Sequence, residues 1–181
     1  MKKLVAGLLA VTMVLSFAGC SGNAVPDFDD WDSHRLGHIT VRVPGEVEVD
    51  SETQQGLEVV ILESTVTGAS VAVLQMIDIV EFLREMGAPE EHIMADALHG
   101  ALDGGIRGFL AEAGGAIRGE SDGVFNGIRY YRMFGVTDLN DAYFDARAFV
   151  YGDDFYIIKF FWDEDGADAV EPFFQSIRFG G

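Results

Sequence analysis

Two groups of strand-forming segments flank a helical centre in this sequence, and this order limits the possible folds more than any other feature. In the first segment, apolar and polar residues alternate from Ile39 to Val43, and the turn-forming pair Pro44-Gly45 follows. This pattern is typical of a half-buried strand. The other segments are rich in β-branched and aromatic residues and are separated by short turns. The predicted strands cover residues 39–43, 57–63, 70–76, 127–136, 143–151 and 155–162.

The middle of the chain has a helical pattern. Residues 79–86 form a short helix candidate, and a second helix is predicted from Pro89 to about Asp103, because proline and the acidic residues after it suit a first turn. The glycines from Gly104 onward predict a break, since each glycine costs a helix interior about 1 kcal/mol relative to alanine. A last short helix is expected near residues 168–176. We therefore predict one α+β domain in which helices cover an antiparallel β-sheet.

The first residues have the layout of a secretory signal peptide. Lys2 and Lys3 precede an apolar run from Leu4 to Leu15, and a small-residue tail follows. A membrane-spanning helix needs about 20 apolar residues, so this run is too short for one. We expect residues 1–19 to be removed as a lipoprotein signal peptide.

The residue after this segment, Cys20, is expected to carry a lipid. Ala18-Gly19-Cys20 is similar to the end of a lipobox, in which the cysteine thiol accepts a diacylglyceryl group. Cys20 is also the only cysteine of the chain, and an unpaired thiol is otherwise a liability in an oxidising compartment. The alternatives are an ordinary signal peptide with a chance cysteine and a buried structural thiol. The expected location is the outer side of a cell membrane, with the lipid as the anchor.

The chain is strongly acidic, with a formal net charge of -18. This charge disfavours nucleic acid as a partner and also disfavours a polybasic lipid-docking surface. Residues 20–36 are polar and acidic and contain Pro26, so they are expected to form a flexible tether. Residues 37–181 are then a single α+β domain.

Four segments carry a family resemblance. They are HITVRVPG at 38–45, NGIRYY at 126–131, GDDFYIIKFF at 152–161 and FFQSIRF at 173–179. Together they resemble the PsbP/Mog1/DcrB-like superfamily of α/β/α sandwiches, many of whose bacterial members are lipoproteins. The resemblance implies a non-enzymatic module that binds or assembles other components of the cell envelope, and it names no ligand.

Motifs for catalysis and cofactors are not found in the sequence. No serine lies in a Gly-x-Ser-x-Gly elbow. The acidic segment around Gly166 does not fit an EF-hand, because Phe161 and Pro172 fall where the first and last carboxylate ligands belong. We therefore predict no enzyme activity and no cofactor.

One helix face is a candidate metal site. His92, Asp96 and His99 recur at steps of four and three residues, so on a helix they would stack on one side and offer two imidazoles and a carboxylate to a divalent cation. The alternative is a solvated polar face. The expected function is a membrane-tethered binding or assembly module with a protein partner in the envelope. A metal- or pH-responsive envelope protein and a solute-binding lipoprotein are the alternatives.

Overall fold

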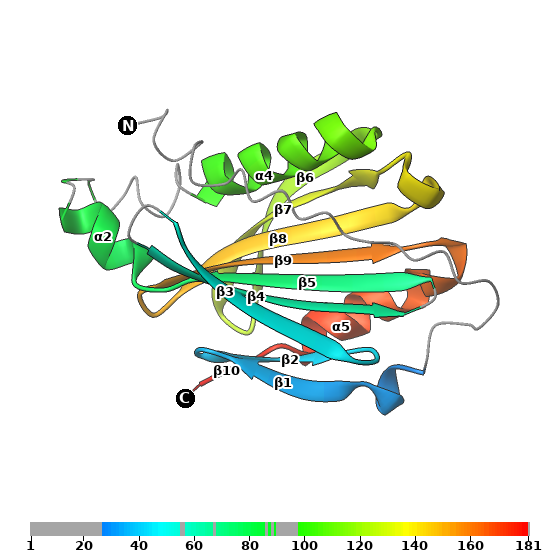
Figure 1. Ribbon diagram of the computed structural model, residues 1–181, viewed down its shortest axis with the longest axis horizontal. Coiled ribbons are helices and arrows are strands. Elements are labelled where there is room, and N and C mark those ends of the chain that lie inside the picture. Colours follow the sequence, from blue (N-terminus) through cyan, green and yellow to red (C-terminus); the bar gives the residue numbers. More distant parts are fainter. Residues whose placement is uncertain are drawn as a thin grey trace.

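The computed structural model describes residues 27–54, 57–66, 68–85, 87, 89 and 98–180. These residues form three layers (Figure 1), with a large antiparallel sheet in the middle, helices on one side, and a small sheet with a helix on the other. None of the helices in this described part of the chain has the length and apolar character needed to span a bilayer. The predicted fold class, an antiparallel sheet covered by helices, is confirmed.

The middle layer is a seven-stranded sheet with the strand order β3-β4-β5-β9-β8-β7-β6, and every pairing is antiparallel. Its strands are β3 (Val47–Gln54), β4 (Leu57–Val66), β5 (Ala69–Met76), β6 (Ala116–Phe125), β7 (Ile128–Val136), β8 (Tyr143–Tyr151) and β9 (Asp154–Trp162). Consecutive strands are neighbours except where β9 lies between β5 and β8. Strand β9, the last of the seven in sequence, therefore lies at the centre of the sheet.

The central strand β9 is buried on both faces. Tyr156, Ile158 and Phe160 share one face and are fully buried, and β9 pairs with β8. Phe155, Ile157 and Phe161 occupy the other face. A strand that is covered on both sides reads as a continuous apolar run, which describes most of this segment.

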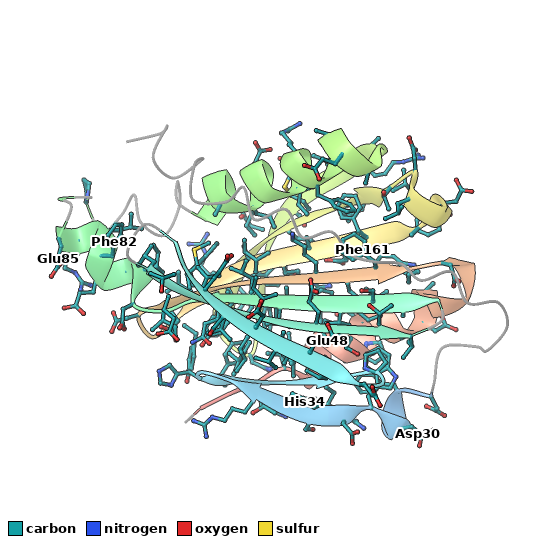
Figure 2. The ribbon with its side chains drawn as sticks, in the orientation of Figure 1. Asp30, His34, Glu48, Phe82, Glu85 and Phe161 are labelled. Atoms are coloured by element: carbon teal, nitrogen blue, oxygen red, sulfur yellow. The ribbon has the colours of Figure 1, made fainter. Side chains whose placement is uncertain are left out.

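On the first side of the sheet lie α2 (Ile79–Glu85) and α4 (Leu98–Ala113). Leu102 and Ile106 of α4 are fully buried against the sheet. Phe109 of α4 meets Phe161 of β9 edge-on, with ring centroids 5.2 Å apart, and Figure 2 shows Phe161 on the helix-covered side of its strand. These apolar contacts determine the position of α4 on the sheet.

On the other side lie a three-stranded sheet and a short helix. The small sheet has the order β1-β2-β10, and the 3-10 turn η1 leads into it. Trp31, between η1 and β1, is 3% exposed and stacks near Phe160 of β9. The elements not yet given are η1 (Phe28–Asp30), β1 (Asp32–Leu36), β2 (Ile39–Val43), η3 (Leu139–Asp141), η4 (Glu164–Ala169), α5 (Val170–Ser176) and β10 (Arg178–Phe179).

Five elements differ from the sequence predictions. Residues 28–36, assigned above to the tether, fold as η1 and β1, because Trp31 and Leu36 find burial against the large sheet. Helix α4 continues through Gly104, Gly105 and Gly108, so the predicted break is wrong, and burial of Ile106 outweighs the low helix propensity of glycine. Two edge strands, β3 and β6, were not predicted, because their alternating charged residues and glycines give a weak strand signal.

Candidate functional site: an arginine-lined basin

A basin opens on the outer side of the small sheet, between η1 and α5, with a volume of about 710 Å³. Thr40 and Arg42 of β2 form its floor. One wall comes from the first described residues and the other from α5 and β10, so residues about 140 positions apart meet here. The walls consist of Phe28, Trp31, Asp32 and Ser33 on one side and Pro172, Gln175, Ser176 and Arg178 on the other.

Strand register explains why arginines gather on this side. Side chains alternate between the two faces of a strand, and Ile39, Val41 and Val43 of β2 all point inward to the core. Thr40 and Arg42 therefore point outward. Thr40 lies opposite Arg35 of β1 and opposite Arg178 of β10, so these two arginines share the outer face with Arg42. We call the three residues Arg35, Arg42 and Arg178 the arginine face.

Arg42 is held in place by backbone carbonyl groups. Its Nε donates to the carbonyl oxygen of Trp31 at 3.1 Å, and its Nη2 donates to that of Asp29 at 2.8 Å. Its guanidinium carbon lies 4.7 Å from the centroid of the Phe28 ring, a cation–π distance. These contacts fix the orientation of the side chain without neutralising its charge.

The other two arginines are held in the same way. Arg35 Nε donates to the carbonyl oxygen of Gly37 at 3.0 Å, and Arg178 Nη1 donates to that of Gln175 at 3.0 Å. Within the part of the chain that the structure describes, none of the three arginines forms a salt bridge with a carboxylate. The arginine face thus keeps three positive charges on the surface of a chain whose net charge is -18.

A buried ion network positions α5, the far wall of the basin. Asp145 of β8 is fully buried and accepts from Arg132 Nε at 2.8 Å and from Arg147 Nε at 3.2 Å. Arg147, which is 3% exposed, also donates to Glu171 of α5 at 3.1 Å, and its guanidinium lies 3.6 Å from the centroid of Phe174. A buried charge is tolerated only where its hydrogen bonds are satisfied, and this network meets that condition.

The same network reaches the basin through Glu171. Its Oε1 accepts from Gln175, which lines the basin, at 3.4 Å. Burial by itself would raise the pKa of Glu171, but the hydrogen bond and positive charge of Arg147 hold it below its ordinary value. Glu171 is therefore ionised near neutral pH, and α5 is held to the sheet by a charged contact.

This arrangement suits the binding of a discrete anion. Guanidinium groups recognise carboxylates and phosphates through parallel N–H···O bonds. Thr40, Ser33 and Gln175 add neutral donors around the two arginines of the basin. Ser176 also lines the basin, and its hydroxyl donates to the carbonyl oxygen of Phe173 at 2.7 Å.

Of the predicted metal ligands, His99 is the one that the structure describes; His92 and Asp96 lie outside the described residues. The imidazole of His99 stacks on Tyr131 of β7 with ring centroids 3.7 Å apart, and its Nε2 lies 3.5 Å from Asp122 Oδ1. His99 thus already contacts the sheet, although its side chain is 49% exposed. The metal site stays a prediction.

The surroundings of His99 form a polar cluster between α4 and the β6–β7 hairpin. Tyr131 donates to Glu120 at 2.6 Å, and burial together with this acceptor raises the pKa of Tyr131. Arg107 Nε pairs with Asp103 at 2.5 Å, and its Nη2 lies 3.8 Å from Glu120. No group of three His, Cys, Asp or Glu side chains in the described ranges has the geometry of a metal site.

The predicted lipidation site, Cys20, also lies outside the described residues. The arginine face was not singled out from the sequence, where its members are separated by up to 143 positions. The available signal is that Arg42 occupies a polar position between the apolar residues of a predicted strand. Only the pairing of β10 with β2 brings Arg178 to the same face.

Comparisons with known proteins concern the fold. No protein-family profile and no curated protein matches the chain. Among solved structures, cyanobacterial PsbP from Synechocystis matches with a TM-score of 0.49 at 13% identity, over 91% of this chain and 98% of that one. A protein of unknown function from Pseudomonas aeruginosa matches with a TM-score of 0.35 at 11% identity, over 81% and 94%.

Proposed function

We propose that the protein is an extracytoplasmic lipoprotein, anchored to a membrane through a lipid on Cys20, and that it acts there as a non-catalytic binding or assembly module. The arginine-lined basin is the observation that carries the proposal for binding. It receives an anionic group of an envelope component. The lipid anchor rests on the residues before the folded domain, where the signal-like segment precedes Cys20.

The proposed anchor is close to the basin along the chain. Phe28 lines the basin and lies eight residues after Cys20. Eight residues span at most about 28 Å when fully extended. A lipid on Cys20 would therefore keep the basin close to the membrane surface, within reach of other membrane-bound components.

Metabolic labelling with a fatty acid tests the anchor. The wild-type protein should carry the label and stay in the membrane fraction, and Cys20→Ala should lose the label because the acceptor thiol is gone. A labelled, membrane-bound alanine variant would show that the lipoprotein proposal is wrong.

Affinity capture from native membranes tests the basin. Arg42→Gln/Arg178→Gln removes two positive charges from the basin, whereas Arg129→Gln removes one from the exposed start of β7 and serves as the control. The double variant should lose its captured partners and the control should keep them. If both variants capture the same partners as wild type, the basin is not the binding site.

A further inference from the structure

The carboxylates near the arginine face limit which anionic partners can bind to it. An extended anionic surface, such as a bilayer, would also meet Asp32 in the basin and the carboxylates of η1. Figure 2 shows Asp30 of η1 beside the small sheet. Charges are screened beyond about 8 Å at physiological salt, so a short row of carboxylates on the arginines meets fewer of these aspartates than a bilayer would.

One such row is exposed on the chain itself. The edge strand β3 carries Glu48, Asp50 and Glu52 at alternate positions, and all three are exposed. Figure 2 shows Glu48 on this strand. In register, Glu48 and Asp50 lie opposite Glu63 and Ile61 of β4. We call Glu48, Asp50 and Glu52 the acidic row.

The spacing between carboxylates in the acidic row is similar to the spacing between arginines of the arginine face. Alternate residues of a strand lie about 6.7 Å apart, and neighbouring strands lie about 4.8 Å apart. Arg42 is two residues and one strand away from Arg35 and equally from Arg178, which corresponds to about 8 Å between their backbone positions. Long arginine side chains can adjust by the remaining difference, so two neighbouring carboxylates of the acidic row can each meet one guanidinium.

The two surfaces face opposite sides of the molecule. The acidic row shares a strand face with Val59 and Ile61 across the β3–β4 pair, which is the side of α2 and α4. The arginine face looks outward from the small sheet, on the other side of the large sheet. One chain therefore cannot join its own two surfaces.

We infer that the arginine face of one copy docks on the acidic row of a second copy. The inference rests on the proposed function and names the assembly partner of the same site. Because the two surfaces differ, the contact is head-to-tail, and repeating it builds a ring or an open chain of copies rather than a twofold dimer. Confinement to a membrane raises the local concentration of the protein, and this favours the weak charged contact.

Carbodiimide cross-linking of the full-length protein in its membrane tests the contact. The reagent joins a lysine amine directly to a carboxylate as an amide, with loss of water, only when the two groups touch. Arg42→Lys keeps the charge and supplies an amine, in a chain whose single lysine after Lys3 is Lys159. Vesicles holding a mixture of isotope-labelled and unlabelled copies should yield mixed-isotope peptides that join position 42 to Glu48 or Asp50.

Three variants make the result specific. Arg129→Lys places an amine on the exposed start of β7 and should give no such mixed product. Adding Glu48→Gln/Asp50→Asn to Arg42→Lys should lower its yield at least fivefold, and Arg178→Lys should repeat the result from a second position. Cross-links confined to single chains, or equal mixed yields in all variants, would overturn the inference. If mixed products are absent while capture still depends on Arg42 and Arg178, the proposed function stands and self-assembly is wrong.

Discussion

Lys159 lies inside the protein, and replacing it should make the protein more stable. It occupies the helix-covered face of the central strand β9, between Ala72 of β5 and Ala146 of β8, and is 7% exposed. Burial lowers the pKa of the Lys159 amine from 10.5 to about 8, against an opposing effect of the Glu63 carboxylate. The charged amine is thus less favourable in the folded protein than in the unfolded chain.

The lowered pKa gives the size and the pH range of the effect. At about 1.4 kcal/mol for each pH unit, a fall from 10.5 to about 8 corresponds to a destabilisation of about 3 kcal/mol at neutral pH. Below pH 8 the amine is protonated in both states, so the destabilisation is constant. Between pH 8 and 10.5 only the unfolded chain binds the proton, so the stability of the wild-type protein rises with pH in this range.

Urea unfolding of wild type and Lys159→Met tests this reasoning. Methionine keeps the length and apolar character of the side chain, so at pH 7 the variant should have a free energy of unfolding about 3 kcal/mol higher. The gain should shrink from pH 8 upward and vanish near pH 10.5. Arg129→Met, which removes an exposed cation, should change stability little at any pH. A less stable methionine variant, or a gain independent of pH, would refute the burial argument.

Four further substitutions test the packing of the sheet and helices by urea unfolding. Phe160→Ala should lower the free energy of unfolding by about 3 to 5 kcal/mol, because this fully buried ring would leave a cavity; a loss under 1 kcal/mol would contradict its central position. Gly108→Ala should raise stability by about 1 kcal/mol, since an added Cβ on α4 meets no atom within 4 Å, whereas Gly127→Ala, at a φ of +82°, should lower it. Asp145→Asn should cost about 3 kcal/mol or more, because Arg147 then loses its buried counter-charge and keeps only the exposed carboxylate of Glu171, and an unchanged midpoint would show that the network contributes nothing.

The residues of single strands were largely predictable from the sequence. Residues 39–43, 143–151 and 155–162 were located nearly to the residue, because alternation and aromatic content report burial directly. The edge strands were not, since strand β3 presents charges at alternate positions and gains its hydrogen bonds from β4 rather than from any local preference. The sequence predicted too early an end for helix α4, because its glycines have low helix propensity. The burial of Ile106 that compensates for them depends on a sheet formed by other parts of the chain.

The sequence by itself determined the class of the fold and the expected cellular location. Both follow from local properties of consecutive residues, namely the periodicity of apolar residues and the signal-like first segment. The basin depended on the tertiary structure. Arg42 and Arg178 line the same basin only because β10, which follows α5 in the chain, pairs with β2 at a register that places Arg178 opposite Thr40. Pairing between distant strands is decided by the burial of whole sheet faces, and the residue pattern of one strand does not show which strand it pairs with.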